Sequence, residues 1–243
     1  GDAMTAKVKI YGERHTNTNY LSHLIRLNLE VGLVPGVCPT YVRALERWLR
    51  APSLRDRYFA RTYSKNLGWK HCAVALQQHP AEVCFITLTK NPYAWLLSMF
   101  RRPYHLSSAA PTFEEFLQTP WPTAGRDNLQ SLVRNPVELW NLKNQSYRNL
   151  PSSQTLYLTS EETLMDPERV ISDIAAKTNA LKKQITFLNR EPSTKKNTDK
   201  DRAYYTDYYL NQRWRAELSD KAVSLINASV DKSLMQQYRY KLV

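Results

Sequence analysis

Polar and cationic side chains gather in a short stretch near the start of the chain. The stretch runs from Gly12 to Asn19, reads GERHTNTN, and lies between a short alternating apolar run and an amphipathic segment. At the end of a strand and the start of a helix, unpaired backbone N–H groups and a nearby cation favour a bound anion. The stretch therefore predicts an anion-binding loop.

The loop differs from the Walker A pattern of nucleotide triphosphatases. GxxxxGK[ST] would place Gly at position 17 and Lys at position 18, where this chain has Asn17 and Thr18. Asn tolerates the left-handed backbone conformation that a glycine would supply. The missing lysine disfavours triphosphate hydrolysis and favours a less charged group held by N–H donors and hydroxyls.

A second pair of residues with the same chemistry lies in mid-chain. Lys90 directly follows the apolar run VCFITLT, and Ser98 comes eight positions later in a segment that Pro92 is suited to open as a helix. Between the two stretches, the sequence LGWKHC contributes Lys70 and His71.

These three segments, in this order, resemble the PAPS-dependent sulfotransferase family. The resemblance implies an enzyme that transfers the sulfuryl group of PAPS to a hydroxyl or amine of a small-molecule acceptor such as a secondary metabolite, leaving PAP. It places the 5′-phosphosulfate near six loop residues and the 3′-phosphate near Lys90 and Ser98, and a late basic loop closes over the 3′-phosphate in relatives. The six loop residues are Arg14, His15, Thr16, Asn17, Thr18 and Asn19, and the candidates in the late loop are Lys195, Lys196 and Arg202.

The resemblance also suggests how the chemistry is divided. We expect His71 to be the general base, because an unperturbed pKa near ~6.5 suits proton transfer at neutral pH. Lys70 would then steady the transferring group, with Glu13 as the second candidate base. Many members have lysine where this chain has His15, so Arg14 or Lys70 is expected to stabilise the transition-state charge. Arginine is usual where this chain has Lys90, which replaces a bidentate contact by a point charge.

Simpler interpretations stay open for each residue. Arg14 can pair with Glu13, and Thr16, Thr18 and Asn19 can form a helix cap without a ligand. Lys70 and His71 would face opposite ways on a strand. The tyrosine pairs at 204–205 and 208–209 are more typical of packing than of a pocket.

The arrangement of elements predicts the fold. Strands are expected at 7–11, 83–89 and 155–159, each followed by a helix, at about 17–31, 92–101 and 161–177, with a break at Pro167. Short helices are expected within 35–61, and a loop with a helix near 113–117 within 111–136. A loop is expected at 190–202, followed by one helix over 209–229. Three strand–loop–helix units predict an α/β fold, a single domain with a central parallel β-sheet flanked by helices. The resemblance implies that this fold is of the P-loop NTPase-like sulfotransferase type. Residues 1–3 resemble an expression-tag remnant, and 4–243 would form the domain.

Composition limits the partners. The chain has 34 Lys plus Arg against 22 Asp plus Glu, a formal charge of +12, which favours an anionic ligand. Two other functions stay open: a P-loop-type nucleotide kinase or NTPase, and a non-catalytic polyanion or nucleic-acid binder. Dispersed basic residues favour the small anion, so we expect no nucleic-acid or membrane partner.

Cys38, Cys72 and Cys84 form no CxxC pair, so we expect no metal and a reducing cytoplasm.

Overall fold

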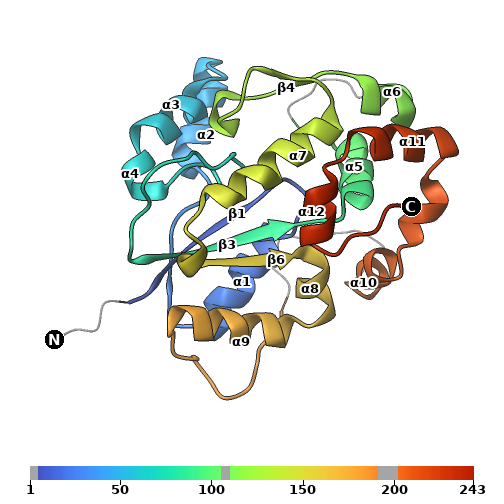
Figure 1. The fold of residues 1–243 in the computed structure, drawn as a ribbon. Helices are drawn as coiled ribbons and strands as arrows, with labels where there is room; N and C mark the ends of the chain where they lie inside the picture. Colours follow the sequence, from blue (N-terminus) through green and yellow to red (C-terminus); the bar gives the residue numbers. More distant parts are fainter. Residues whose placement is uncertain (1–4, 105–109, 191–201) are drawn as a thin grey trace.

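A parallel β-sheet forms the centre of the computed structural model, which describes residues 5–104, 110–190 and 202–243 (Figure 1). Within these residues the main sheet has the order β2-β1-β3-β6, and all its neighbouring strands are parallel. Its strands are β1 (Lys7–Gly12), β2 (Gly32–Leu33), β3 (Val83–Thr89) and β6 (Thr155–Thr159). The prediction of a single α/β domain with a central parallel sheet agrees with this architecture.

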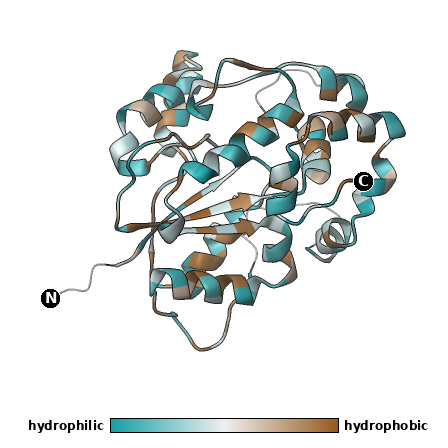
Figure 2. Cartoon of the chain, viewed as in Figure 1, coloured by the Kyte–Doolittle hydropathy of each residue, from teal (hydrophilic) through white to brown (hydrophobic). Residues whose placement is uncertain are grey.

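Alternating side chains of the strands serve two cores. Val8, Ile10 and Ile86 pack with α1 (Thr18–Asn28) and α9 (Pro167–Thr178) on one face, while Tyr11 and Phe85 pack on the other. Figure 2 shows apolar residues concentrated on these central strands. Both faces of the two inner strands are thus covered, which explains the nearly continuous apolar run of β3.

A layer of helices lies over the second face of the sheet (Figure 1). Its apolar cluster includes residues of α5 (Pro92–Arg101), α6 (Phe113–Gln118), α7 (Pro136–Ser146), α11 (Asp220–Ser229) and α12 (Lys232–Gln237). The other elements are α2 (Thr40–Leu49), α3 (Leu54–Arg61), α4 (Tyr63–Asn66), α8 (Ser160–Met165), α10 (Arg202–Leu210), the strands β4 (Trp121–Pro122) and β5 (Leu132–Val133), and the 3₁₀ helices η1 (Gly125–Asp127), η2 (Tyr147–Asn149), η3 (Ser152–Gln154) and η4 (Arg213–Glu217). None of the helices in the described ranges is both long and apolar enough to span a bilayer.

The predicted strands and first three helices are confirmed, but the single helix over 209–229 is wrong. Residue Gln212 has a positive φ of 51°, and η4 then carries Trp214 into the core, where it stacks on Tyr93 with ring centroids 5.7 Å apart. Ser219 caps a new helix by accepting a hydrogen bond from the Ala222 amide. Burial of one tryptophan therefore divides the segment in two.

Four buried charges join segments that lie far apart in the sequence. The Lys143 Nζ atom of α7 lies 2.8 Å from Glu13 Oε2 and 2.7 Å from Asp127 Oδ1, and it also donates to the carbonyl of His71. The Arg14 guanidinium lies 3.1 Å from Glu13 Oε1 and 3.6 Å from Asp127 Oδ1. Although burial raises the pKa of Asp127, Lys143 and Arg14 outweigh it and lower that pKa to about 2. We call these four residues the buried ion cluster.

A buried lysine fixes a second set of loops. Lys9 Nζ donates to the carbonyl oxygens of Pro35, Asn66 and Gly68 at 3.0, 2.7 and 2.5 Å. Burial lowers the pKa of Lys9 to about 7, while the three carbonyls satisfy all three donors of its ammonium form. The segments before α2 and after α4 are thereby attached to β1.

Replacing Lys143 by methionine should test the buried ion cluster. The substitution leaves Glu13 and Asp127 buried with one cation instead of two, so the unfolding free energy should fall by about 3–5 kcal/mol. Urea denaturation measures the change. The matched control Lys65→Met removes an exposed lysine of α4 and should cost less than about 0.5 kcal/mol. A loss below about 1 kcal/mol for Lys143→Met would show that the cluster does not stabilise the fold.

Candidate active site

The loop after β1 folds back over the end of its own strand. A Cβ atom on Gly12 would lie 2.7 Å from Thr16 Oγ1 and 2.9 Å from Thr18 Cγ2, so only glycine fits there. His15 and Asn17 take the left-handed conformation, with φ of 65° and 66°. The prediction that Asn17 would stand in for glycine is confirmed.

The helix that follows turns backbone N–H groups towards the loop. The first helical hydrogen bond runs from Leu21 N to Asn17 O, at 3.1 Å, so the amides of Thr18 and Asn19 precede it. The side chain of Asn17 makes no capping hydrogen bond. The N-terminus of α1 is therefore open to an anion.

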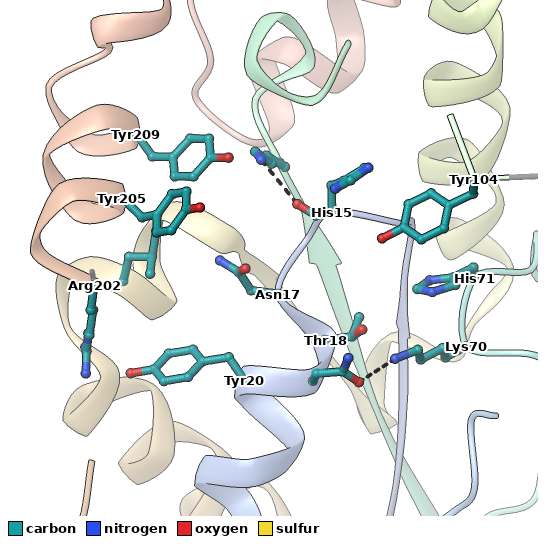
Figure 3. A pocket seen from close by; sticks show the side chains of 13 residues that line it. His15, Asn17, Thr18, Tyr20, Lys70, His71, Tyr104, Arg202, Tyr205 and Tyr209 are labelled. Carbon is teal, nitrogen blue, oxygen red and sulfur yellow. Dashed lines mark hydrogen bonds between the residues drawn. The ribbon is translucent and has the colours of Figure 1, made fainter. Parts of the chain in front are cut away.

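A cavity of about 310 Å³ lies in front of this helix terminus (Figure 3). It is bordered by the loop and α1, the turn at 70–71, the end of β3, and helices α8 and α10. Its described lining residues include cations and aromatic rings but no aspartate or glutamate: His15, Asn17, Thr18, Asn19, Tyr20, Lys70, His71, Lys90, Tyr104, Leu164, Arg202, Tyr205 and Tyr209. Within the described ranges, no group of three or more His, Cys, Asp or Glu side chains could hold a metal ion.

Lys90 connects the loop with α5 and α10. Its Nζ atom donates to Ser98 Oγ and to His15 O, each at 3.2 Å, and lies 3.9 Å from the centre of the Tyr209 ring. Burial alone would raise the pKa of Tyr209, but the neighbouring Lys90 ammonium lowers it overall. The eight-residue spacing from Lys90 to Ser98 thus brings both groups together, while their contact with a phosphate stays a prediction.

Lys70 and His71 line the same cavity, because they lie in a turn rather than on a strand. The Lys70 carbonyl accepts a hydrogen bond from Gly12 N at 2.9 Å, and Lys70 Nζ donates to Asn19 Oδ1 at 2.7 Å. Burial, then Arg26, lowers the pKa of Lys70 to about 8. The simpler interpretation, in which the two side chains would face opposite ways on a strand, is therefore wrong.

The imidazole of His71 has one fixed nitrogen. Its Nδ1 lies 2.5 Å from Gly12 O, so Nδ1 carries the proton and Nε2 keeps a lone pair. Burial lowers the pKa of His71 well below its usual value of 6.5, and Lys70 and Arg14 add to the effect. His71 is therefore neutral at pH 7 with an acceptor nitrogen available.

His15 is also neutral. Its Nε2 lies 3.1 Å from Arg102 O, its ring centre is 5.0 Å from that of Tyr104, and burial lowers its pKa to about 4. A neutral imidazole cannot supply the positive charge that a lysine would bring to this position. His15 lines the cavity as predicted, but the fixed cations there are Lys70, Lys90 and Arg202.

The side chains of Arg14 and Thr16 do not reach the cavity, which corrects the prediction of direct contact for both. Arg14 is only 3% exposed, belongs to the buried ion cluster and lies over Trp69 at 4.8 Å. Thr16 Oγ1 donates to Glu13 O at 2.6 Å and so closes the loop on itself. Glu13, the second candidate base, is held by Lys143 inside the protein. Lys195 and Lys196 lie outside the described residues.

The sequence did not predict that two tyrosines of α10, Tyr205 and Tyr209, line one side of the cavity. Tyr205 and Tyr209 lie four residues apart on α10, their rings stack with centroids 6.4 Å apart, and both face the cavity (Figure 3). Arg202, one turn earlier, lies 5.2 Å from the centre of the Tyr20 ring. The four-residue spacing of the tyrosines was the available signal, since it puts both rings on one helix face.

Comparison with known proteins gives matches at the level of structure. No family model matches the sequence, and no curated protein matches it significantly. Solved structures that align with almost the whole chain include sulfotransferase domains. They include the domain of the Synechococcus PCC 7002 olefin synthase (14% identity, TM-score 0.47, covering 100% of this chain and 98% of that one) and mouse sulfotransferase SULT7A1 complexed with PAP (12%, 0.46, 98% and 85%). A third is the domain of the curacin biosynthetic pathway (10%, 0.41, 98% and 99%).

The two partly buried histidines, His15 and His71, should make the fold sensitive to acid. Both have lowered pKa values in the folded state, so below about pH 6.5 the unfolded chain binds more protons than the folded one. The unfolding free energy should fall with decreasing pH between about 6.5 and 4, by up to about 1.4 kcal/mol per pH unit for each histidine. Urea denaturation at pH 7, 6 and 5 measures this slope. His71→Gln should reduce the slope, and an unchanged slope would contradict the neutral state of the folded His71 imidazole.

Proposed function

We propose that this protein is a PAPS-dependent sulfotransferase acting on a hydroxyl or amine of a small-molecule acceptor. One observation carries the proposal: the N-terminus of α1 and Lys90, whose ammonium donates to Ser98, border a single cavity and are joined by the hydrogen bond from Lys90 Nζ to His15 O. PAPS carries one anionic group at each end of its ribose, so two anion sites on one cavity fit its chemistry.

The residues present suit each part of this donor. The α1 amides, with Asn17, Thr18 and Asn19, would hold the 5′-phosphosulfate, and Lys90 with Ser98 would hold the 3′-phosphate. The aromatic rings of Tyr205 and Tyr209 offer a flat surface for the adenine. Two features argue against a site for a nucleotide triphosphate with magnesium. Thr18 stands where the Walker A pattern has lysine, and the described residues that line the cavity include no carboxylate.

PAPS supplies a sulfuryl group bonded to a phosphate leaving group. In the proposed reaction, His71 Nε2 removes the proton from the acceptor hydroxyl while the acceptor oxygen bonds to sulfur and the bond from sulfur to the phosphate oxygen breaks. Lys70, on the same cavity, would stabilise the charge that develops on the sulfuryl and phosphate oxygens. The carbonyl of Gly12 favours the imidazolium once it forms, because it accepts the Nδ1 proton.

Binding of PAP tests the donor site. PAP at a hundred times its Kd should stabilise the protein by about 2.7 kcal/mol, seen as a rise in Tm. Lys90→Met should weaken PAP binding by about 1.5–3 kcal/mol, roughly 10- to 150-fold, and Lys90→Arg should restore it. The control Lys182→Met removes an exposed lysine and should leave the affinity unchanged. Stabilisation by ATP with magnesium but not by PAP would instead favour a nucleotide kinase or NTPase.

The pH profile of turnover tests the assignment of base and cation. The acid limb of kcat/KM should lie below pH 6.5, where His71 takes up a proton, and the basic limb near pH 8, where Lys70 loses one. Lys70→Arg should move the basic limb upward. His71→Gln should lower kcat by about 10²–10⁴-fold with PAP affinity retained. Equal turnover of His71→Gln and the unaltered protein, followed as PAP released from PAPS with an acceptor panel, would reject His71 as the base.

A further inference from the structure

A second hollow of about 460 Å³ adjoins the donor cavity. Asn19 and Lys70 line both spaces, and their hydrogen bond of 2.7 Å marks the boundary. Figure 3 shows Lys70 at the edge of the donor cavity, next to His71. A molecule in the second hollow would therefore lie next to the proposed transfer site.

One wall of this hollow is a polar stripe of α1. Ser22, His23 and Arg26 come three, four and seven residues after Asn19, which puts all four on one side of the helix. Leu21, Leu24 and Ile25 of the same helix are buried against the sheet. The stripe therefore stays available on the outside of the fold.

The opposite wall is formed where the chain leaves the edge strand β2. Leu33, Val34, Pro35 and Val37 line it and are largely apolar. Gly36 fixes Lys70 at the boundary: its carbonyl accepts from Lys70 N at 2.8 Å, and a Cβ on Gly36 would lie 2.7 Å from Lys70 Cβ. The hollow thus has one cationic and one apolar side.

The cations of this hollow lack the acidic partners found elsewhere. Lys143 and Arg14 each have carboxylates within 4 Å, whereas no carboxylate of the described residues forms an ion pair with Lys70 or Arg26. Arg26 is close enough to Lys70 to help lower its pKa. Two like charges bordering one hollow repel each other, and an anion between them would relieve the repulsion.

We propose that this hollow is the acceptor site and that it selects acceptors bearing a negative group, namely a carboxylate, phosphate or sulfate. The anionic group binds beside Arg26, the apolar body lies against residues 33–37, and the reacting hydroxyl passes Lys70 towards His71. This inference rests on the proposed function, because it assigns the donor to the neighbouring cavity.

Calorimetric titration of matched probes tests the inference. The first set of probes is the acid 4-hydroxyphenylacetate, its neutral methyl ester and the cationic amine tyramine. The second set is the acid glucose 6-phosphate and neutral glucose. Each probe is added to the protein in the absence and in the presence of saturating PAP. At least one acid should bind roughly tenfold tighter than its neutral counterpart. Arg26→Gln should abolish that preference, and Arg26→Glu should favour tyramine over the acid. Arg47→Glu makes the same charge change on an exposed arginine of α2 and should preserve the preference.

The outcomes separate the two proposals. Absence of preference for an acid in either set, or a preference that Arg26→Glu leaves intact, overturns the acceptor inference. PAP affinity of the Arg26 variants should equal that of the unaltered protein, since Arg26 does not line the donor cavity. If the unaltered protein fails to bind PAP, the proposed function fails, while the acid preference measured without PAP still decides the chemistry of the hollow.

Discussion

The site depends on the placement of one ammonium group, Lys143 Nζ, between the carboxylates of Glu13 and Asp127. Burying a charge costs several kcal/mol unless partners compensate it, and here two cations face two anions in a region closed to water. The arrangement is stable only when all four groups are in place. It therefore connects the loop after β1, helix α7 and the η1 segment as one unit.

The same unit determines where the reactive groups lie. Lys143 also holds the carbonyl of His71, and Gly12 contacts both Lys70 and His71 through its backbone N–H and carbonyl. Loops normally vary in position. Here the loop after β1 and the turn at 70–71 are hydrogen-bonded to each other and to Lys143 of helix α7. Arg14 contributes to this support rather than to the cavity, since its charge is neutralised inside the protein.

The sequence predicts the elements well where pattern and chemistry agree. The apolar run of β3, the proline that opens α5 and the glycine-like role of Asn17 all follow from local rules, and the structure has each of them. The direction of a charged side chain does not follow from such rules. The sequence allows Arg14 either to pair with Glu13 or to contact a ligand, and only the structure shows that it turns inward while Lys70 turns towards the cavity.

Other features arise only from tertiary contacts. Lys143 lies in a helical segment whose pattern gives no sign that a lysine is fully buried there. Tyr205 and Tyr209 form a pocket wall because the chain from 202 onward returns to the first loop, a long-range approach that spacing along the chain cannot reveal. The break near Gln212 follows from the need to bury Trp214, which depends on Tyr93 being its neighbour.

The contacts of Lys90 also have a thermodynamic consequence. A lysine side chain in water samples many rotamers, and ordering one costs up to about 2 kcal/mol of conformational entropy. Here Ser98, the carbonyl of His15 and the ring of Tyr209 already confine the ammonium group. Because the Lys90 side chain is already ordered in the folded protein, a phosphate that binds at this end of the cavity does not bear the entropy cost of ordering it.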